Sequence, residues 1–180
     1  MPQLSLSGVA VPVRDARLPD RQGIRRVLLA AYREFAAVLP PALFGPYLAD
    51  ILDLDARARS GRLLMAEHAG RVAGTVTCYG DAAAEGLGWP PGWAGLRDLG
   101  VDPALRRLGI GRALVEACRQ LAEAAGAPVL CLHTAAFMPA ALSLYEAIGF
   151  RRAPAFDLDV AGRPEGARPV RLLAYRLDLA

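Results

Sequence analysis

The segment from Leu96 to Ala113 has the residue types most able to do chemistry, because a strand-like pattern leads through a turn into two glycines and a helix. Gly109 and Gly111 lack a Cβ atom, so a ligand can approach the main chain closely there. The first N–H groups of a helix have no partner within it and lie at the positive end of its dipole, which suits phosphate oxygens. Three arginines add positive charge at the same place: Arg106, Arg107 and Arg112. The segment therefore indicates a ligand that carries phosphate.

Other interpretations of these glycines are available. A Rossmann dinucleotide motif needs a third glycine where the chain has Leu114, and the strand ending at Val101 does not run directly into Gly109. A P-loop needs a lysine, and the chain contains none. Taken alone, the glycines also fit an ordinary loop beside a solvated arginine surface.

A second segment, 141–150, reads ALSLYEAIGF, a helical pattern that ends at a glycine. Two parts of the chain resemble the two signature motifs of the GNAT superfamily of N-acetyltransferases, and they occur in the same order. The first is VDP (101–103) with RRLGIG (106–111), and the second is this segment. The resemblance extends over the whole chain. It implies a single GNAT domain over residues 1–180, with a mixed α/β fold: a mostly antiparallel sheet of about seven strands flanked by about four helices.

The resemblance also implies acetyl-CoA as the acetyl donor and indicates which residues hold it. Backbone amides of the glycine turn would bind the pyrophosphate: Arg107, Leu108, Gly109, Ile110, Gly111 and Arg112, with Arg106 adding charge. The backbone of Leu99, Gly100 and Val101 would pair with the pantetheine arm as an added strand does, and Gly100 suits the bulge that separates this strand from the next. A main-chain N–H there would also polarise the thioester carbonyl.

Further contacts to the cofactor are implied for Met138, Ala141 and Tyr145. Met138 stands where the family often has an asparagine, so one hydrogen bond to pantetheine is lost or is made by main chain. Tyr145 matches a tyrosine that lies near the sulfur and, as a general acid, can protonate the departing thiolate. The alternative is that Tyr145 is a core aromatic of a helix face.

The general base is not evident from the motifs, because Gly95 stands where family members often have a glutamate. The candidates to replace it are Asp98, His133, Glu67 and Glu85. The ordinary pKa of histidine, about 6.5, suits His133 to this task. Many amines can also lose their proton to bulk water before they attack, so deprotonation by water is the alternative to a side-chain base.

The implied reaction is direct transfer of acetyl to a primary amine of a small molecule or peptide. Residues 38–44 and 88–93 are apolar and proline-rich, and they predict either a pocket for an amine with a hydrophobic or aromatic body, or a lid or homodimer contact. The sequence has no dense acidic cluster, which disfavours a polycationic acceptor. The non-catalytic alternatives are an acyl-CoA-binding module and an interaction domain on a vestigial GNAT scaffold.

The elements that must position these residues follow from hydrophobic periodicity and turn signals. The pattern predicts strands at 9–14, 62–68, 71–79, 96–101, 128–134, 156–160 and 170–179, and helices at 21–38, 42–55, 109–125 and 139–148.

The composition is that of a globular protein, with 54% hydrophobic and 22% charged residues among 180. A net charge of +3 gives no argument for nucleic acid or a membrane as partner. All 21 basic residues are arginine, a bias typical of GC-rich bacterial coding. The sequence shows no signal peptide, and its three cysteines have neither disulfide nor metal-site spacing, so we expect a cytoplasmic protein without metal and with buried, inert thiols.

Overall fold

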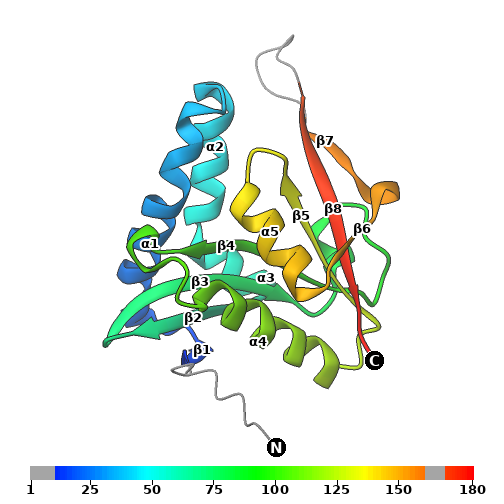
Figure 1. Ribbon diagram of the computed structural model, residues 1–180, viewed down its shortest axis with the longest axis horizontal. Helices are drawn as coiled ribbons and strands as arrows, with labels where there is room; N and C mark the ends of the chain where they lie inside the picture. Colours follow the sequence, from blue (N-terminus) through cyan, green and yellow to red (C-terminus); the bar gives the residue numbers. More distant parts are fainter. Residues whose placement is uncertain (1–10, 161–168) are drawn as a thin grey trace, which may run out of the picture.

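A computed structural model describes residues 11–160 and 169–180 of the chain (Figure 1). Its centre is a sheet with the order β1-β2-β3-β4-β5-β8-β6, in which β7 pairs with the same edge of β8 as β6, farther along that strand. Only β4 and β5 pair in parallel, and every other pairing is antiparallel. The strands are β1 (Val13–Asp15), β2 (Arg62–His68), β3 (Arg71–Tyr79), β4 (Ala94–Val101), β5 (Val129–Ala135), β6 (Arg151–Arg152), β7 (Leu158–Val160) and β8 (Val170–Asp178).

Five helices cover the sheet: α1 (Arg21–Tyr32), α2 (Pro41–Leu52), α3 (Leu54–Ser60), α4 (Ile110–Ala124) and α5 (Pro139–Ile148). The helices lie on two faces of the sheet, as the alternating side chains of β2 show. Leu64 and Ala66 pack in the core that α4 covers, whereas Leu63 and Met65 pack in the core formed with α1, α2 and α3. The expected mixed α/β fold with a mostly antiparallel sheet is confirmed, with one more strand and one more helix than predicted.

The two predicted N-terminal helices differ from those observed. The first ends at Tyr32 and continues as a 3-10 turn, Arg33–Ala37, instead of running to Val38. The second is broken at Asp53, whose side chain accepts a hydrogen bond from the N–H of Ala56 at 2.9 Å. An aspartate in this position caps a new helix, so α3 begins where the sequence pattern predicted a continuous one.

Smaller differences occur at the ends of the chain. Residues 9 and 10 of the first predicted strand lie outside the described residues, and β1 begins at Val13. The strand predicted from Phe156 begins at Leu158, because Pro154 to Phe156 form a 3-10 turn, and the short β6 was not predicted. All three cysteines are free and buried, as expected. Within the described ranges, no helix is both long and apolar enough to cross a membrane.

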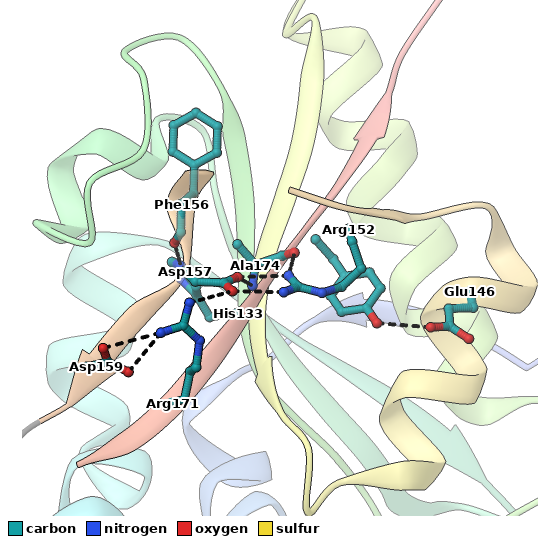
Figure 2. A network of polar contacts seen from close by, with 9 residues as sticks. His133, Glu146, Arg152, Phe156, Asp157, Asp159, Arg171 and Ala174 are labelled. Carbon is teal, nitrogen blue, oxygen red and sulfur yellow. Dashed lines mark hydrogen bonds and ion pairs between the residues drawn. The ribbon is translucent and has the colours of Figure 1, made fainter. Parts of the chain in front are cut away.

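The turn between β6 and β7 is fixed to β8 by Asp157 (Figure 2). Its carboxylate accepts two hydrogen bonds from Arg152, both at 2.8 Å, and one from the N–H of Ala174 at 2.8 Å. Arg171 lies 3.3 Å from the same carboxylate. The Arg152 guanidinium is the main reason that the pKa of Asp157 lies well below its ordinary value.

We predict that Asp157→Asn destabilises the protein by about 1–2 kcal/mol at neutral pH, because hydrogen bonds to a charged acceptor are lost. A depressed pKa in the folded state stabilises the fold above the unfolded pKa of about 3.9, and this contribution is lost as the pH falls through the lower folded pKa. Thermal melts at about pH 7 and pH 3 should therefore show a difference between variant and parent that narrows in acid.

The matched control is Asp159→Asn, which removes an exposed carboxylate on β7 that, among the described residues, pairs only with Arg171 on β8. Because an exposed ion pair contributes little, this variant should melt close to the parent. Equal destabilisation by the two substitutions, or a difference that does not depend on pH, would contradict the assignment.

Candidate active site

The central feature of the site is the gap between β4 and β5. These parallel strands pair only at Ala94 with Leu130 and at Gly95 with Cys131. Beyond Gly95 the two strands separate, so residues 96–101 have no strand partner on that side within the described part of the chain, and the carbonyl of Leu99 accepts a hydrogen bond from the Tyr32 hydroxyl at 3.1 Å. Because backbone groups need hydrogen-bond partners, this open edge suits an extended ligand that adds to the sheet as a strand does.

A β-bulge on the other edge of β4 accompanies the separation. Thr75 lies opposite Gly100 and Thr77 opposite Arg97, so two residues of β4, Asp98 and Leu99, face one residue of β3. Asp98 has a φ of 54°, in the left-handed region. The expectation that Gly100 forms the bulge is therefore wrong. Gly100 stays in register, and its missing side chain makes room for Leu28, whose Cδ2 would lie 3.0 Å from a Cβ there.

The glycine turn lies at the start of α4. Arg107 and Gly109 both have positive φ, 68° and 80°, and Gly109 is the residue before the first turn of the helix. A Cβ on Gly109 would meet nothing within 4 Å, so the main chain is open to a ligand. Gly111 differs, because a Cβ there would lie 3.0 Å from Cδ2 of Leu144. Gly111 thus serves the close approach of α4 and α5, and only Gly109 has the predicted open surface.

The three arginines of this region are arranged differently. Arg106 and Arg107 are exposed on the turn together with Leu108, while Ile110 is buried. The guanidinium of Arg106 forms an ion pair with Glu34 at 2.7 Å, and that of Arg112 lies 3.5 Å from the carbonyl oxygen of Ala147 on α5. The positive charge expected from the sequence is therefore present around the turn, with Arg106 partly neutralised.

A cavity of about 550 Å³ lies against the gap between the strands. Leu96 to Leu99 of β4 and Cys131 to Ala135 of β5 line it, as do Met138, Ala141 and Tyr145 of the second motif. The structure therefore brings most of the residues predicted to be near the thioester together around one space. Gly100, Val101 and the glycine turn lie outside this lining, toward the start of α4.

Tyr145 is buried on α5, and burial raises the pKa of its phenol above the ordinary value. The phenol is thus protonated at neutral pH. Within the described part of the chain its hydroxyl forms no hydrogen bond with protein, although its ring packs against Phe150 at a centroid distance of 5.7 Å. The residue can therefore both pack and keep a proton available for a group in the cavity.

The four candidate bases are placed very differently. Asp98 and Glu85 both line the cavity. Burial raises the pKa of Asp98, and its carboxylate lies 3.4 Å from Nε of Arg57. Glu85 forms a 2.8 Å ion pair with Arg97. Glu67 lies away from the cavity on β2, near Arg14.

His133 also lines the cavity, but its two ring nitrogens are occupied or covered. Nε2 lies 2.8 Å from the carbonyl oxygen of Phe156, so it carries the proton and donates it (Figure 2). Nδ1 is buried and has no hydrogen-bond partner in the described residues. Burial lowers the pKa of the ring, so His133 is neutral. This arrangement favours Asp98 over His133 as the group that receives a proton.

Only some residues of the two apolar segments predicted for the acceptor line the cavity. Leu39, Ala42 and Leu43 line the cavity from the α2 side, and Trp89 lines it from the opposite loop. Trp93 instead lies outside it, with the guanidinium of Arg176 at 4.8 Å from its ring centroid.

Several residues of the site could not be predicted from the sequence. Tyr32, Tyr47 and Tyr79 line the cavity but read as ordinary apolar positions of their elements. Arg57 was missed because its helix, α3, was not predicted. Its Nε donates to Thr77 at 2.8 Å and its Nη1 to the carbonyl of Ile51 at 2.8 Å, which places it beneath the bulge beside Asp98.

Comparison with known proteins identifies the class. Residues 22–150 match the family described as the acetyltransferase (GNAT) family. The chain belongs to this family of acetyl-CoA-dependent N-acetyltransferases. It is also similar to N-acetyltransferase family 8 member 3 of Rattus norvegicus, with 38% identity over 85 residues. That match covers 47% of this chain and only 37% of the relative.

Solved structures with low sequence identity share the fold. The paiA N-acetyltransferase of Thermoplasma acidophilum, solved with coenzyme A, is 12% identical and superposes with a TM-score of 0.71 over 95% of this chain and 100% of its own. An N-acetyltransferase of Staphylococcus aureus Mu50 is 21% identical, with a TM-score of 0.67 over 94% and 99%. The yncA protein of Salmonella typhimurium, solved with acetyl-CoA, is 20% identical, with a TM-score of 0.63 over 94% of each chain.

We predict that Gly109→Ala weakens acetyl-CoA binding by about tenfold or more, the loss expected when one charge-assisted hydrogen bond is disturbed. Gly126→Ala is the matched control, because Gly126 follows the same helix, has a φ of 73° and also faces open space. Both substitutions strain a left-handed residue by about 1–2 kcal/mol. Calorimetry should show weakened binding for Gly109→Ala alone, and equal affinities in the two variants would mean that Gly109 is only a turn residue.

Proposed function

We propose that the protein transfers an acetyl group from acetyl-CoA directly to a primary amine of a small molecule or peptide. The observation that carries this proposal is the separation of β4 from β5, which opens between the glycine turn of α4 and the cavity that Tyr145 lines. Two of the structures that share the fold contain coenzyme A or acetyl-CoA. Family membership supports the same donor.

The binding roles follow from what each segment offers. Arg107, Leu108 and Gly109 are exposed residues at the positive end of α4, where their amides would hold the pyrophosphate. The open edge of Leu99 to Val101 would pair with the pantetheine amides, and Met138 and Ala141 would border the arm from α5. Met138 packs in the core with α1 and accepts a weak contact from the Thr134 hydroxyl, so the main chain must supply any hydrogen bond there.

The transfer forms a bond between the amine nitrogen and the acetyl carbon and breaks the bond between that carbon and sulfur. A proton must leave the nitrogen, and the sulfur must gain one. Asp98, buried in the cavity with a raised pKa, would accept the first proton. Tyr145, a protonated phenol, would donate the second.

A non-catalytic acyl-CoA-binding module would bind the donor in the same gap. Release of free CoA thiol in the presence of a panel of primary amines separates the two functions. An acetyltransferase releases thiol in proportion to acetylated amine, whereas a binding module shows a thermal shift with acetyl-CoA and no thiol release with any amine.

We predict that Tyr145→Phe lowers kcat by about 10²-fold, the low end for a positioned acid, and leaves the acetyl-CoA Kd nearly unchanged. The ring would still pack against Phe150, and only the hydroxyl would be lost. The loss should appear equally in kcat and kcat/KM, as for an interaction made mainly in the transition state. Full turnover with an amine for which chemistry limits the rate would show that Tyr145 is structural, and a collapse in CoA affinity would assign it to binding.

We also predict that Asp98→Asn removes the acidic limb of the kcat/KM profile. In the parent, this limb lies above the ordinary range of an aspartate, because burial raises the pKa of the carboxyl. Asparagine tolerates the left-handed backbone at this position and keeps an oxygen toward Arg57, so the bulge should persist, although loss of the charge opposite Arg57 lowers the stability of the variant. The assay needs an amine of low pKa, so that the amine itself stays neutral across the titration.

Glu85→Gln is the control for this experiment, because it removes the other carboxylate of the cavity, which pairs with Arg97. It should keep the acidic limb. If Asp98→Asn retains the limb, or if Glu85→Gln removes it, the base is not Asp98.

A further inference from the structure

The part of the cavity beyond the thioester end has walls from two elements. One wall comes from α2 and the segment before it, with Leu39, Leu43 and Tyr47, and the other comes from the loop between β3 and β4, with Leu87 and Trp89. These side chains are aliphatic or aromatic. The whole cavity, about 550 Å³, falls in the range of small-molecule pockets, about 300–1,000 Å³, and the acceptor would share it with the thioester end of the donor. The shape and chemistry suit a compact apolar body.

The charged groups that line the cavity are already paired. Glu85 holds Arg97 at 2.8 Å, and Asp50 holds the same guanidinium at 3.6 Å. Asp98 lies 3.4 Å from Arg57. In the described part of the lining there is thus neither a free carboxylate for a second ammonium nor a free cation for a substrate carboxylate. This balance disfavours both polyamines and α-amino acids.

The tryptophan wall is fixed from behind. Trp89 stacks with His133 at a centroid distance of 4.4 Å and with Phe156 at 5.2 Å. Figure 2 shows how the carbonyl of Phe156 meets His133 while its neighbour Asp157 anchors the turn to β8. Contacts with His133 and Phe156 therefore hold this wall, and both residues are tied to each other and to the turn at Asp157. A rigid aromatic surface binds a flat partner at low entropic cost.

We propose that the acceptor is a small primary amine on a flat, uncharged aromatic body, an arylalkylamine, seated between Leu43 and Trp89 with its nitrogen toward Asp98. The proposal rests on the proposed function and deepens it. A substrate with one amine suits a cavity in which Asp98 accepts one proton. The aromatic body suits the apolar walls. The short alkyl link would reach from those walls to the gap between β4 and β5.

The test compares initial rates of CoA release at saturating acetyl-CoA for phenethylamine, butylamine, spermidine, phenylalanine and a tripeptide with N-terminal phenylalanine. Burial of the ring predicts that kcat/KM for phenethylamine exceeds that for butylamine by about tenfold or more. It should also exceed the values for the other three. Equal or higher values for any of these compounds would overturn the inference.

Leu43→Ala and Leu48→Ala form a matched pair on α2. Leu43 lines the cavity, whereas Leu48 is also half-buried but packs against the core of α1. We expect Leu43→Ala to reduce the preference for phenethylamine over butylamine by about threefold or more, and Leu48→Ala to leave that ratio unchanged. An unchanged ratio in Leu43→Ala, or the same change in both variants, would overturn the assigned wall.

Failure of this inference and failure of the proposed function have different signatures. If none of these amines releases CoA thiol although acetyl-CoA raises the melting temperature, the proposed transferase function and the inference both fail. If amines are acetylated without preference for the aromatic compound, only the inference fails.

Discussion

The structure depends on one constraint: β4 must leave β5 after only two paired residues and still remain in the sheet through β3. The bulge at Asp98 allows this, because two residues of β4 face one of β3 and the strand bends away. The unpaired edge that results is largely half-buried, and buried backbone groups without partners are costly. A ligand bound in the gap would supply those hydrogen-bond partners.

The bulge is held in place from below. A left-handed aspartate is uncommon, and its carboxylate is buried, so it needs a partner of opposite charge. Arg57 provides it, and this arginine is itself fixed by Thr77 on β3 and by the carbonyl of Ile51 on α2. Removal of one member of a buried pair typically costs about 3–5 kcal/mol. Helix α3 thus contributes to the site by carrying Arg57.

The sequence predicted those features that local chemistry determines. The turn at Gly109, the start of α4 and the placement of Tyr145 on α5 follow from glycine, proline and periodic apolar residues within short segments. It did not predict the Arg57–Asp98 pair, because the two residues come from elements far apart in the chain. For the same reason it could not distinguish Gly111, which faces Leu144, from Gly109, which faces open space, or Trp89 from Trp93.

Gly95 shows why the carboxylate of this site lies where it does. The resemblance to the family places a glutamate at this position in many members, and here even a Cβ would lie 2.9 Å from the Cβ of Ala82. Ala82 begins the 3-10 turn Ala82–Glu85, which therefore fills the space that a longer side chain on β4 would need. That turn also brings Glu85 to the cavity, where Arg97 pairs with it. The cavity carboxylate on β4 itself is then Asp98, which lies three positions after Gly95 and within the unpaired edge. A glutamate restored at Gly95 would have to displace the turn Ala82–Glu85, so β4 has no room for a carboxylate at this position.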